Sequence, residues 1–201
     1  MNIGIIPRIR RIKKNSIEYS IDKKLIDILN TIYKKPKIII IHDFKIKKLN
    51  LLVISGGNDL KLFSKKKNDL IRNKISLFHL KKSFKKKIPV VGICYGAQLI
   101  AHIFKSKIKK YQNHVGNHPV RLEDSLFNKN LKKINKVNSY HNYAITNLGT
   151  SLLPLAKATD NTIEAFKHKK YKILGIMWHP ERYDQIKKID IEYFLRIKWY
   201  C

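Results

Sequence analysis

Apolar residues recur along this chain in two patterns, as short continuous runs and as longer stretches with helical spacing. The continuous runs are typical of strands buried on both faces, and they cover Asn2–Ile6, Lys37–Ile41, Leu51–Ser55 and Pro89–Ile93. The helical spacing predicts helices over Ser16 to about Tyr33 (with Ser16 as N-cap), Asn68 to about Lys86, and Gly96–Phe104. Strands that alternate with helices predict parallel strands joined by crossover helices.

The second half of the chain has a different pattern of apolar and turn residues. Residues 107–158 hold short strand-like pieces and many turn residues, and two further strands, Thr162–Lys167 and Ile173–Trp178, flank a basic turn. Ile186–Trp199 has the spacing of a closing helix. The whole pattern predicts the α/β class, with a single open, mostly parallel sheet and helices on both faces. No repeat or linker divides the 201 residues, so we expect one domain over residues 1–201.

The net charge changes which partners are considered. The 43 Lys and Arg residues exceed the 14 Asp and Glu residues by 29, a balance found in nucleic-acid binders. A second interpretation is codon bias, because Lys far outnumbers Arg, and Ile and Asn are also abundant. The lysines are spread over the whole chain, whereas a dedicated surface favours clustered Arg. We therefore expect no nucleic-acid partner, although the positive field can help to capture an anionic small molecule.

Three features of the sequence bear on the cellular compartment: the N-terminus, the apolar runs and the cysteines. The opening MNIGIIPRIRR has basic residues after its apolar run, which is the reverse of a secretory signal. The longest apolar runs are too short to cross a membrane. Two cysteines, Cys94 and Cys201, make no disulfide framework. A cytoplasmic protein without membrane contact is the expectation.

Cys94 stands in the sequence Gly92-Ile93-Cys94-Tyr95-Gly96, between a predicted buried strand and a predicted helix. This is the context of a nucleophile elbow. So tight a turn strains the backbone of the nucleophile, and side chains two residues before and after it would collide, which explains the glycines. The helix start favours a thiolate, and the N–H of Tyr95 is free for an oxyanion. The alternative is a buried structural cysteine.

A cysteine nucleophile needs a base, and the stretch GIMWHPERYD offers one. His179 and Glu181 lie two residues apart after an apolar run, so that in extended chain both project to one side. Glu181 can then orient the imidazole, which gives a Cys-His-Glu variant of the catalytic triad. The alternative is a surface His-Pro turn with a solvated glutamate.

The other histidines carry less information. His114 and His118 have the spacing of a helical metal site, but a glycine and a proline disfavour a helix there and no cysteine or carboxylate cluster joins them. We therefore expect no metal. We expect structural or exposed positions for the histidines at 42, 79, 102 and 168.

Four stretches together resemble the class I glutamine amidotransferase superfamily. They are SGGNDL, GICYGAQLIAHIF, NHVGNHPV followed by VNSYHNYAI, and GIMWHPE. Within the superfamily the chain is most similar to the γ-glutamyl hydrolase branch, through IGIIPR, SIEYSIDKKLIDIL and DNTIEAFKHKKYKILGIMWHPER. These stretches look closest to the γ-glutamyl-CDP-amidate hydrolases of surface-polysaccharide phosphoramidate pathways. The resemblance implies a flavodoxin-like core and a hydrolase that releases glutamate without metal or organic cofactor.

The resemblance also implies roles for individual residues. Cys94 attacks the γ-carbonyl, His179 carries the proton and Glu181 orients His179. The N–H groups of Gly57 and Tyr95 form the oxyanion hole. The substrate-binding residues are Gly56, Gln98, Ser139, Tyr140 and His141.

One residue departs from the pattern of that branch, which usually carries Arg where this chain has Tyr95. Tyrosine at this position is more similar to the ammonia-donating amidotransferases. An amidotransferase subunit that delivers ammonia to a partner synthetase is therefore a second hypothesis. A basic binding protein with a relic triad is a third.

Overall fold

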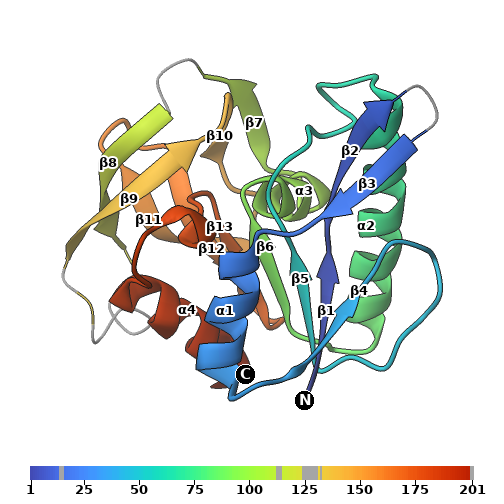
Figure 1. Cartoon of the computed structure of the whole chain (residues 1–201). Coiled ribbons are helices and arrows are strands. Elements are labelled where there is room, and N and C mark those ends of the chain that lie inside the picture. Colours follow the sequence, from blue (N-terminus) through green and yellow to red (C-terminus); the bar gives the residue numbers. More distant parts are fainter. Residues whose placement is uncertain (14–15, 112–114, 124–130, 132, 200–201) are drawn as a thin grey trace.

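The computed structural model describes residues 1–13, 16–111, 115–123, 131 and 133–199 (Figure 1). Its helices are α1 (Lys23–Tyr33), α2 (Lys67–Lys85), α3 (Tyr95–Ile103), α4 (Lys188–Trp199) and the short 3-10 turn η1 (Pro180–Arg182). Its strands in the first half of the chain are β1 (Asn2–Ile6), β2 (Arg8–Lys13), β3 (Ser16–Ser20), β4 (Lys37–Ile40), β5 (Leu51–Ile54) and β6 (Val90–Ile93). Those in the second half are β7 (Lys107–Lys110), β8 (Val115–Leu122), β9 (Ile134–Tyr140), β10 (Tyr143–Asn147), β11 (Leu152–Ala158), β12 (Ile163–His168) and β13 (Ile173–Ile176).

Within the described residues, eleven strands form one open sheet and β2 pairs with β3 in a separate hairpin. The core of the sheet is parallel, in the order β4-β1-β5-β6-β13. Beyond β13 the sheet continues through antiparallel pairs to β12, β11, β8 and β9, and β10 links β12 to β7. The α/β class with an open sheet is confirmed. The antiparallel extension comes from the half of the chain with short strand-like pieces.

Helices cover both faces of the parallel core (Figure 1). In β5, Leu51 and Val53 pack into the core cluster that contains residues of α1 and α4, whereas Leu52 and Ile54 pack into the cluster of α2 and α3. Successive side chains of a strand point to opposite faces, so a strand that is buried on both faces needs apolar residues throughout. This explains the continuous apolar runs in the sequence.

The predicted helix from Ser16 to Tyr33 is wrong in its first part. Ser16–Ser20 is strand β3, paired antiparallel with β2, and α1 begins only at Lys23 after the N-cap residue Asp22. Residues 17, 19 and 21 are apolar, and this period of two competes with the helical spacing over the same stretch. The carboxylate of Asp22 accepts a hydrogen bond from Nη2 of Arg8 at 2.8 Å, which ties the hairpin to the start of α1.

The other predicted elements are present with small shifts of their ends. Asn2–Ile6 is exact, and most other boundaries move by one or two residues, as in Val90–Ile93 for the predicted Pro89–Ile93 and Lys188–Trp199 for the predicted Ile186–Trp199. No described helix is long and apolar enough to cross a membrane.

The end of β13 is joined to α4 by a buried polar contact. The indole Nε1 of Trp178 donates a hydrogen bond to Oδ1 of Asp190 at 2.7 Å, and both side chains are fully buried. Burial raises the pKa of Asp190 to about 7, against the opposing effect of the Trp178 hydrogen bond. The contact fixes the residue that directly precedes His179.

This raised pKa predicts a pH-dependent stability. An aspartate in the unfolded chain ionises near pH 4, so between about pH 4 and 7 the folded state holds a proton that the unfolded state has lost. The free energy of unfolding should therefore fall as pH rises through this range. Asp190→Asn keeps an oxygen that can accept from Trp178 and removes the titration. Urea unfolding measures the free energy of unfolding of both proteins. Relative to the wild type, that of the variant should rise by on the order of 1–4 kcal/mol from pH 4 to pH 7.5. A difference between the two proteins that does not change with pH would contradict this.

Candidate active site

Cys94 lies at the turn between β6 and α3, and its backbone is strained. Its φ is 47° and its ψ −99°, a conformation that L-residues seldom adopt. A Cβ on Gly92 would lie 2.5 Å from the backbone carbon of Gly96, and a Cβ on Gly96 would lie 2.2 Å from the carbonyl oxygen of Ile54. The strain and the role of both glycines agree with the elbow expected from the sequence.

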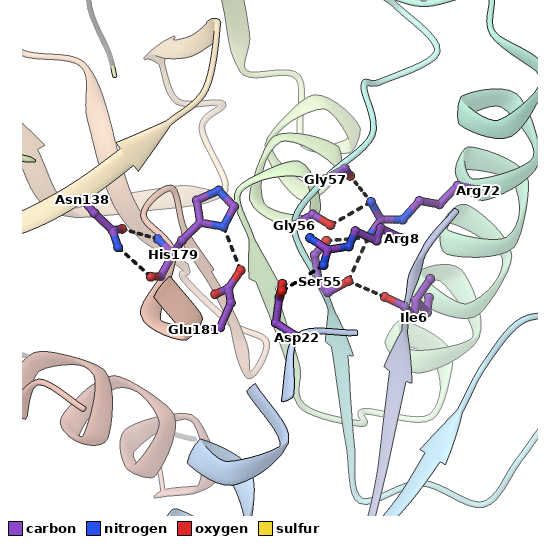
Figure 2. A network of polar contacts seen from close by, with 10 residues as sticks. All are labelled: Ile6, Arg8, Asp22, Ser55, Gly56, Gly57, Arg72, Asn138, His179 and Glu181. Atoms are coloured by element: carbon purple, nitrogen blue, oxygen red, sulfur yellow. Dashed lines mark hydrogen bonds and ion pairs between the residues drawn. The ribbon is translucent and has the colours of Figure 1, made fainter. Parts of the chain in front are cut away.

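His179 and Glu181 follow β13, which is the parallel strand beside β6. His179 is extended, with φ −115° and ψ 90°, and η1 begins directly after it. Nδ1 of His179 lies 2.7 Å from Oε1 of Glu181, and both side chains are buried. The side chain of Asn138 holds the backbone of His179 from β9: its Oδ1 accepts from the His179 N–H at 2.8 Å and its Nδ2 donates to the His179 carbonyl at 2.9 Å (Figure 2).

The loop after β5 passes directly against the imidazole. A Cβ on Gly56 would lie 2.6 Å from Cε1 of His179 and 3.6 Å from Cβ of Cys94. Any side chain at Gly56 would therefore displace the imidazole from its place beside the sulfur. This gives Gly56 a steric role in the site.

The charge state of His179 is set by its neighbours. Burial alone would lower its pKa. The Cys94 sulfur has the larger opposing effect and the Glu181 carboxylate the smaller one, and together they raise the pKa of His179 to about 10. The imidazole is therefore held as an imidazolium at neutral pH. An imidazolium between a sulfur and a carboxylate is a proton donor ready for a leaving group.

A pocket of about 220 Å³ opens above the sulfur. It is lined by six residues that the sequence analysis singled out, Gly57, Cys94, Gln98, Tyr140, His141 and His179, and by Asn58, Asp59, Asn142, Tyr143 and Arg182. The amide of Gln98 donates to the carbonyl of Tyr143 at 2.9 Å, which orients it at the pocket wall. Ser139 is fully buried in β9 and Glu181 lies behind His179, and neither lines the pocket.

Tyr95 has its backbone and its side chain in different surroundings. Its N–H belongs to the first turn of α3, where helical N–H groups have no intrahelical acceptor. Its side chain is fully buried on the other side of the elbow, with its hydroxyl 3.4 Å from Oγ of Ser76. Only the backbone of Tyr95 is therefore available to a substrate.

Three buried polar residues around the site were not predicted from the sequence. Asn138 clamps His179, Arg72 of α2 binds the loop after β5, and Oε1 of Glu164 lies 3.5 Å from Nε2 of His141. Asn138 stands inside a stretch already singled out, and Arg72 is an arginine in a chain that mostly uses lysine. Neither feature of the sequence predicts which residue is contacted, because the contact partners lie far away in the sequence.

The described residues contain no group of three His, Cys, Asp or Glu residues that could hold an ion. His118 lies 3.8 Å from a Glu164 oxygen. His114, the other histidine considered for a metal site, lies outside the described residues.

Known proteins share sequence and fold with this chain. A model of the family described as Peptidase C26 matches residues 32–181. A γ-glutamyl-CDP-amidate hydrolase from Campylobacter jejuni is 43% identical over 156 residues, which cover 75% of this chain and 72% of that protein. The carbamoyl phosphate synthase small chain of Aquifex aeolicus is 35% identical over 116 residues, 53% of this chain and 29% of that one.

Among solved structures, a glutamine amidotransferase from Thermotoga maritima superposes with a TM-score of 0.67 at 18% identity, over 90% of this chain and 76% of the other. This likeness establishes the fold.

The raised pKa of His179 can be tested without a substrate. Because the Cys94 sulfur is the main cause that raises it, Cys94→Ala should lower the pKa of His179, and Glu181→Gln should lower it by a smaller amount. NMR titration of 15N-labelled histidine follows the ring directly. In the wild type the imidazolium signal of His179 should persist at pH 8. A pKa of His179 that is unchanged in Cys94→Ala would contradict the assigned pairing.

Proposed function

Because the chain belongs to the peptidase C26 family, we propose that the protein is a free-standing hydrolase of γ-glutamyl amides. Cys94 is the nucleophile, His179 the proton carrier and Glu181 the residue that orients His179. The observation that supports this best is the 2.7 Å contact of His179 with Glu181 in a site where the imidazole also interacts with the strained Cys94. These are the parts that an activated cysteine nucleophile requires.

The reaction proceeds in two halves. The thiolate of Cys94 attacks the γ-carbonyl carbon, and the electron pair moves to the carbonyl oxygen, which the N–H groups of Gly57 and Tyr95 stabilise. As the intermediate collapses, the C–N bond breaks and the His179 imidazolium gives its proton to the leaving nitrogen. In the second half the neutral His179 takes a proton from water, which attacks the thioester. The C–S bond then breaks, with its electron pair returning to the sulfur, and glutamate leaves. Cys94 is again a thiolate and His179 an imidazolium.

The pocket offers polar groups for the glutamyl part of the substrate. Gln98, Tyr140 and His141 line the wall beside the sulfur, where the α-amino and α-carboxylate groups of a bound glutamyl residue must be held. Gly56 keeps the imidazole in place by its lack of a side chain. Ser139 is fully buried in β9, next to Tyr140.

We infer that the substrate is a γ-glutamyl phosphoramidate nucleotide similar to γ-glutamyl-CDP-amidate, in cytoplasmic surface-polysaccharide biosynthesis. The similar Campylobacter enzyme is named for that substrate. In such a molecule the scissile nitrogen carries a phosphoryl group, so an anion lies at the pocket mouth when the γ-carbon reaches Cys94. Arg182 lines the pocket with its guanidinium 4.3 Å above the ring of Tyr140, and no ion pair is recorded for it among the described residues. Guanidinium groups bind phosphoryl oxygens through paired hydrogen bonds.

The second hypothesis, an amidotransferase subunit that passes ammonia to a partner synthetase, is favoured by the similarity to a carbamoyl phosphate synthase small chain. The two functions differ in their dependence on a partner. A subunit of a synthetase should be nearly idle on glutamine alone, whereas a free-standing hydrolase should turn over its substrate without help.

Glutamate release by the purified protein tests the proposal. We expect rapid release from γ-glutamyl-CDP-amidate and slow release from glutamine. Cys94→Ala and His179→Ala should lower kcat at least about a thousandfold, and Glu181→Gln should cost less, because an orienting residue contributes less than a nucleophile. Circular dichroism serves as the control for folding. Retained turnover in Cys94→Ala would refute the mechanism, and release that requires a synthetase would favour the amidotransferase.

Arg182 gives a test of the leaving group in particular. For Arg182→Met we expect kcat/KM to fall about 10- to 100-fold with γ-glutamyl-CDP-amidate and to stay within about threefold with γ-glutamyl-4-nitroanilide, which has no phosphoryl group. Lys169→Met, an exposed residue after β12, removes the same charge elsewhere and should leave both substrates unaffected. An equal loss with both substrates would instead place Arg182 at the glutamyl group.

A further inference from the structure

We propose that Arg72 is the positioning residue of the oxyanion loop, which we define as residues Ser55, Gly56, Gly57 and Asn58 after β5. The inference rests on the proposed function, because the loop supplies an oxyanion donor only if acyl transfer occurs at Cys94. Arg72 comes from the first half of α2, its side chain is fully buried, and it reaches the loop from the side opposite His179 (Figure 2).

The guanidinium binds the carbonyl groups of three successive residues. Nη2 donates to the carbonyl of Ser55 at 2.6 Å and to its Oγ at 3.1 Å. Nη1 donates to the carbonyl of Gly56 at 3.0 Å and also to the carbonyl of Gly57. A single side chain thus fixes the orientation of three consecutive peptide groups.

Those bonds determine where the N–H groups of the loop point. In a trans peptide the C=O and the following N–H point in opposite directions, and the described residues contain no cis peptide bond. Since the carbonyls of Gly56 and Gly57 point toward Arg72, the N–H groups of Gly57 and Asn58 point away from it. Both residues line the pocket beside Cys94, and neither N–H donates a backbone hydrogen bond within the described residues.

The same guanidinium also contacts the other half of the oxyanion hole. Its carbon lies 4.0 Å from the centre of the Tyr95 ring, a cation–π distance. The N–H of Tyr95 is the second proposed donor. Arg72 therefore sets the oxyanion loop relative to the start of α3, and both donors depend on one group.

Only arginine has the shape for this task. No carboxylate lies within ion-pair distance of Arg72 among the described residues, so carbonyl oxygens and the ring take the place of a counter-ion. A lysine would keep the charge but would present one nitrogen in place of a planar fork, and could not hold the carbonyls of Ser55 and Gly57 together. R72K therefore separates geometry from charge.

The first experiment measures kinetics with γ-glutamyl-CDP-amidate and, in parallel, alkylation of Cys94 by iodoacetamide, a reaction that needs no oxyanion hole. For R72K we expect kcat to fall about 10- to 100-fold, KM to stay within about threefold, and the alkylation rate to stay within about threefold. R72M should lose more in kcat, because it also removes the charge. Lys74→Met, at an exposed site of the same helix, should match the wild type.

Two kinetic results would overturn the proposal. One is a kcat within threefold of the wild type in folded R72K and R72M. The other is a loss of alkylation in R72K that parallels the loss of kcat, because Arg72 would then act on the sulfur or on the whole site.

The second experiment needs no substrate and therefore separates this inference from the proposed function. Hydrogen exchange followed by NMR should be at least about tenfold faster in R72K and R72M than in the wild type for the N–H of Ser55, which donates to the carbonyl of Ile6 at 3.2 Å, and unchanged in Lys74→Met. Unchanged exchange in R72M would overturn the positioning role even if the enzyme is active. A wild type that hydrolyses no γ-glutamyl substrate would refute the proposed function, while the exchange result would still decide the role of Arg72.

Discussion

The site depends on the contact between the start of α3 and the end of β5. The backbone of Gly96 approaches the carbonyl of Ile54 so closely that a single Cβ there would lie 2.2 Å from the oxygen. Ile54 is the last residue of β5, and the oxyanion loop begins with the next residue. Because the helix lies directly on the strand, the elbow that carries Cys94 and the loop that carries Gly57 are held at a fixed separation. Protein interiors are too closely packed for such a contact to relax without moving both segments.

The order of the parallel strands then brings the remaining parts together. β5, β6 and β13 are neighbours in the sheet, and their carboxyl ends lead respectively to the oxyanion loop, to Cys94 and to His179. Parallel strands present their carboxyl ends at one edge of the sheet, where open α/β sheets place their ligands. His179 is far from Cys94 in the sequence but belongs to the adjacent strand in space. Two further contacts hold His179. Asn138, from the antiparallel part of the sheet, binds its backbone, and Asp190 binds the preceding residue, Trp178.

The parts of this structure that the sequence predicted are those encoded locally. The apolar runs gave the parallel strands, and the glycines on both sides of Cys94 gave the elbow, because each depends on neighbouring residues. The pairing of β2 with β3 was missed because Ser16–Ser20 has an apolar pattern that also fits a helix, and the choice was made by contacts with Arg8–Lys13. Arg72 and Asn138 were missed for a related reason. Their partners lie 14–17 and 41 residues away in the sequence, and no local pattern records such a contact.

Tyr95 shows how the structure changes the meaning of a sequence difference. The γ-glutamyl hydrolase branch that this chain resembles usually has an arginine after the cysteine, and tyrosine there is more similar to ammonia-donating enzymes. The Tyr95 side chain, however, does not line the pocket; it lies buried beneath Arg72 of α2. A positive group therefore remains beside the elbow, although it is supplied from a different element. The residue at position 95 thus bears on how the oxyanion loop is supported, and we expect the choice between hydrolysis and ammonia delivery to depend instead on the pocket, which Arg182 lines.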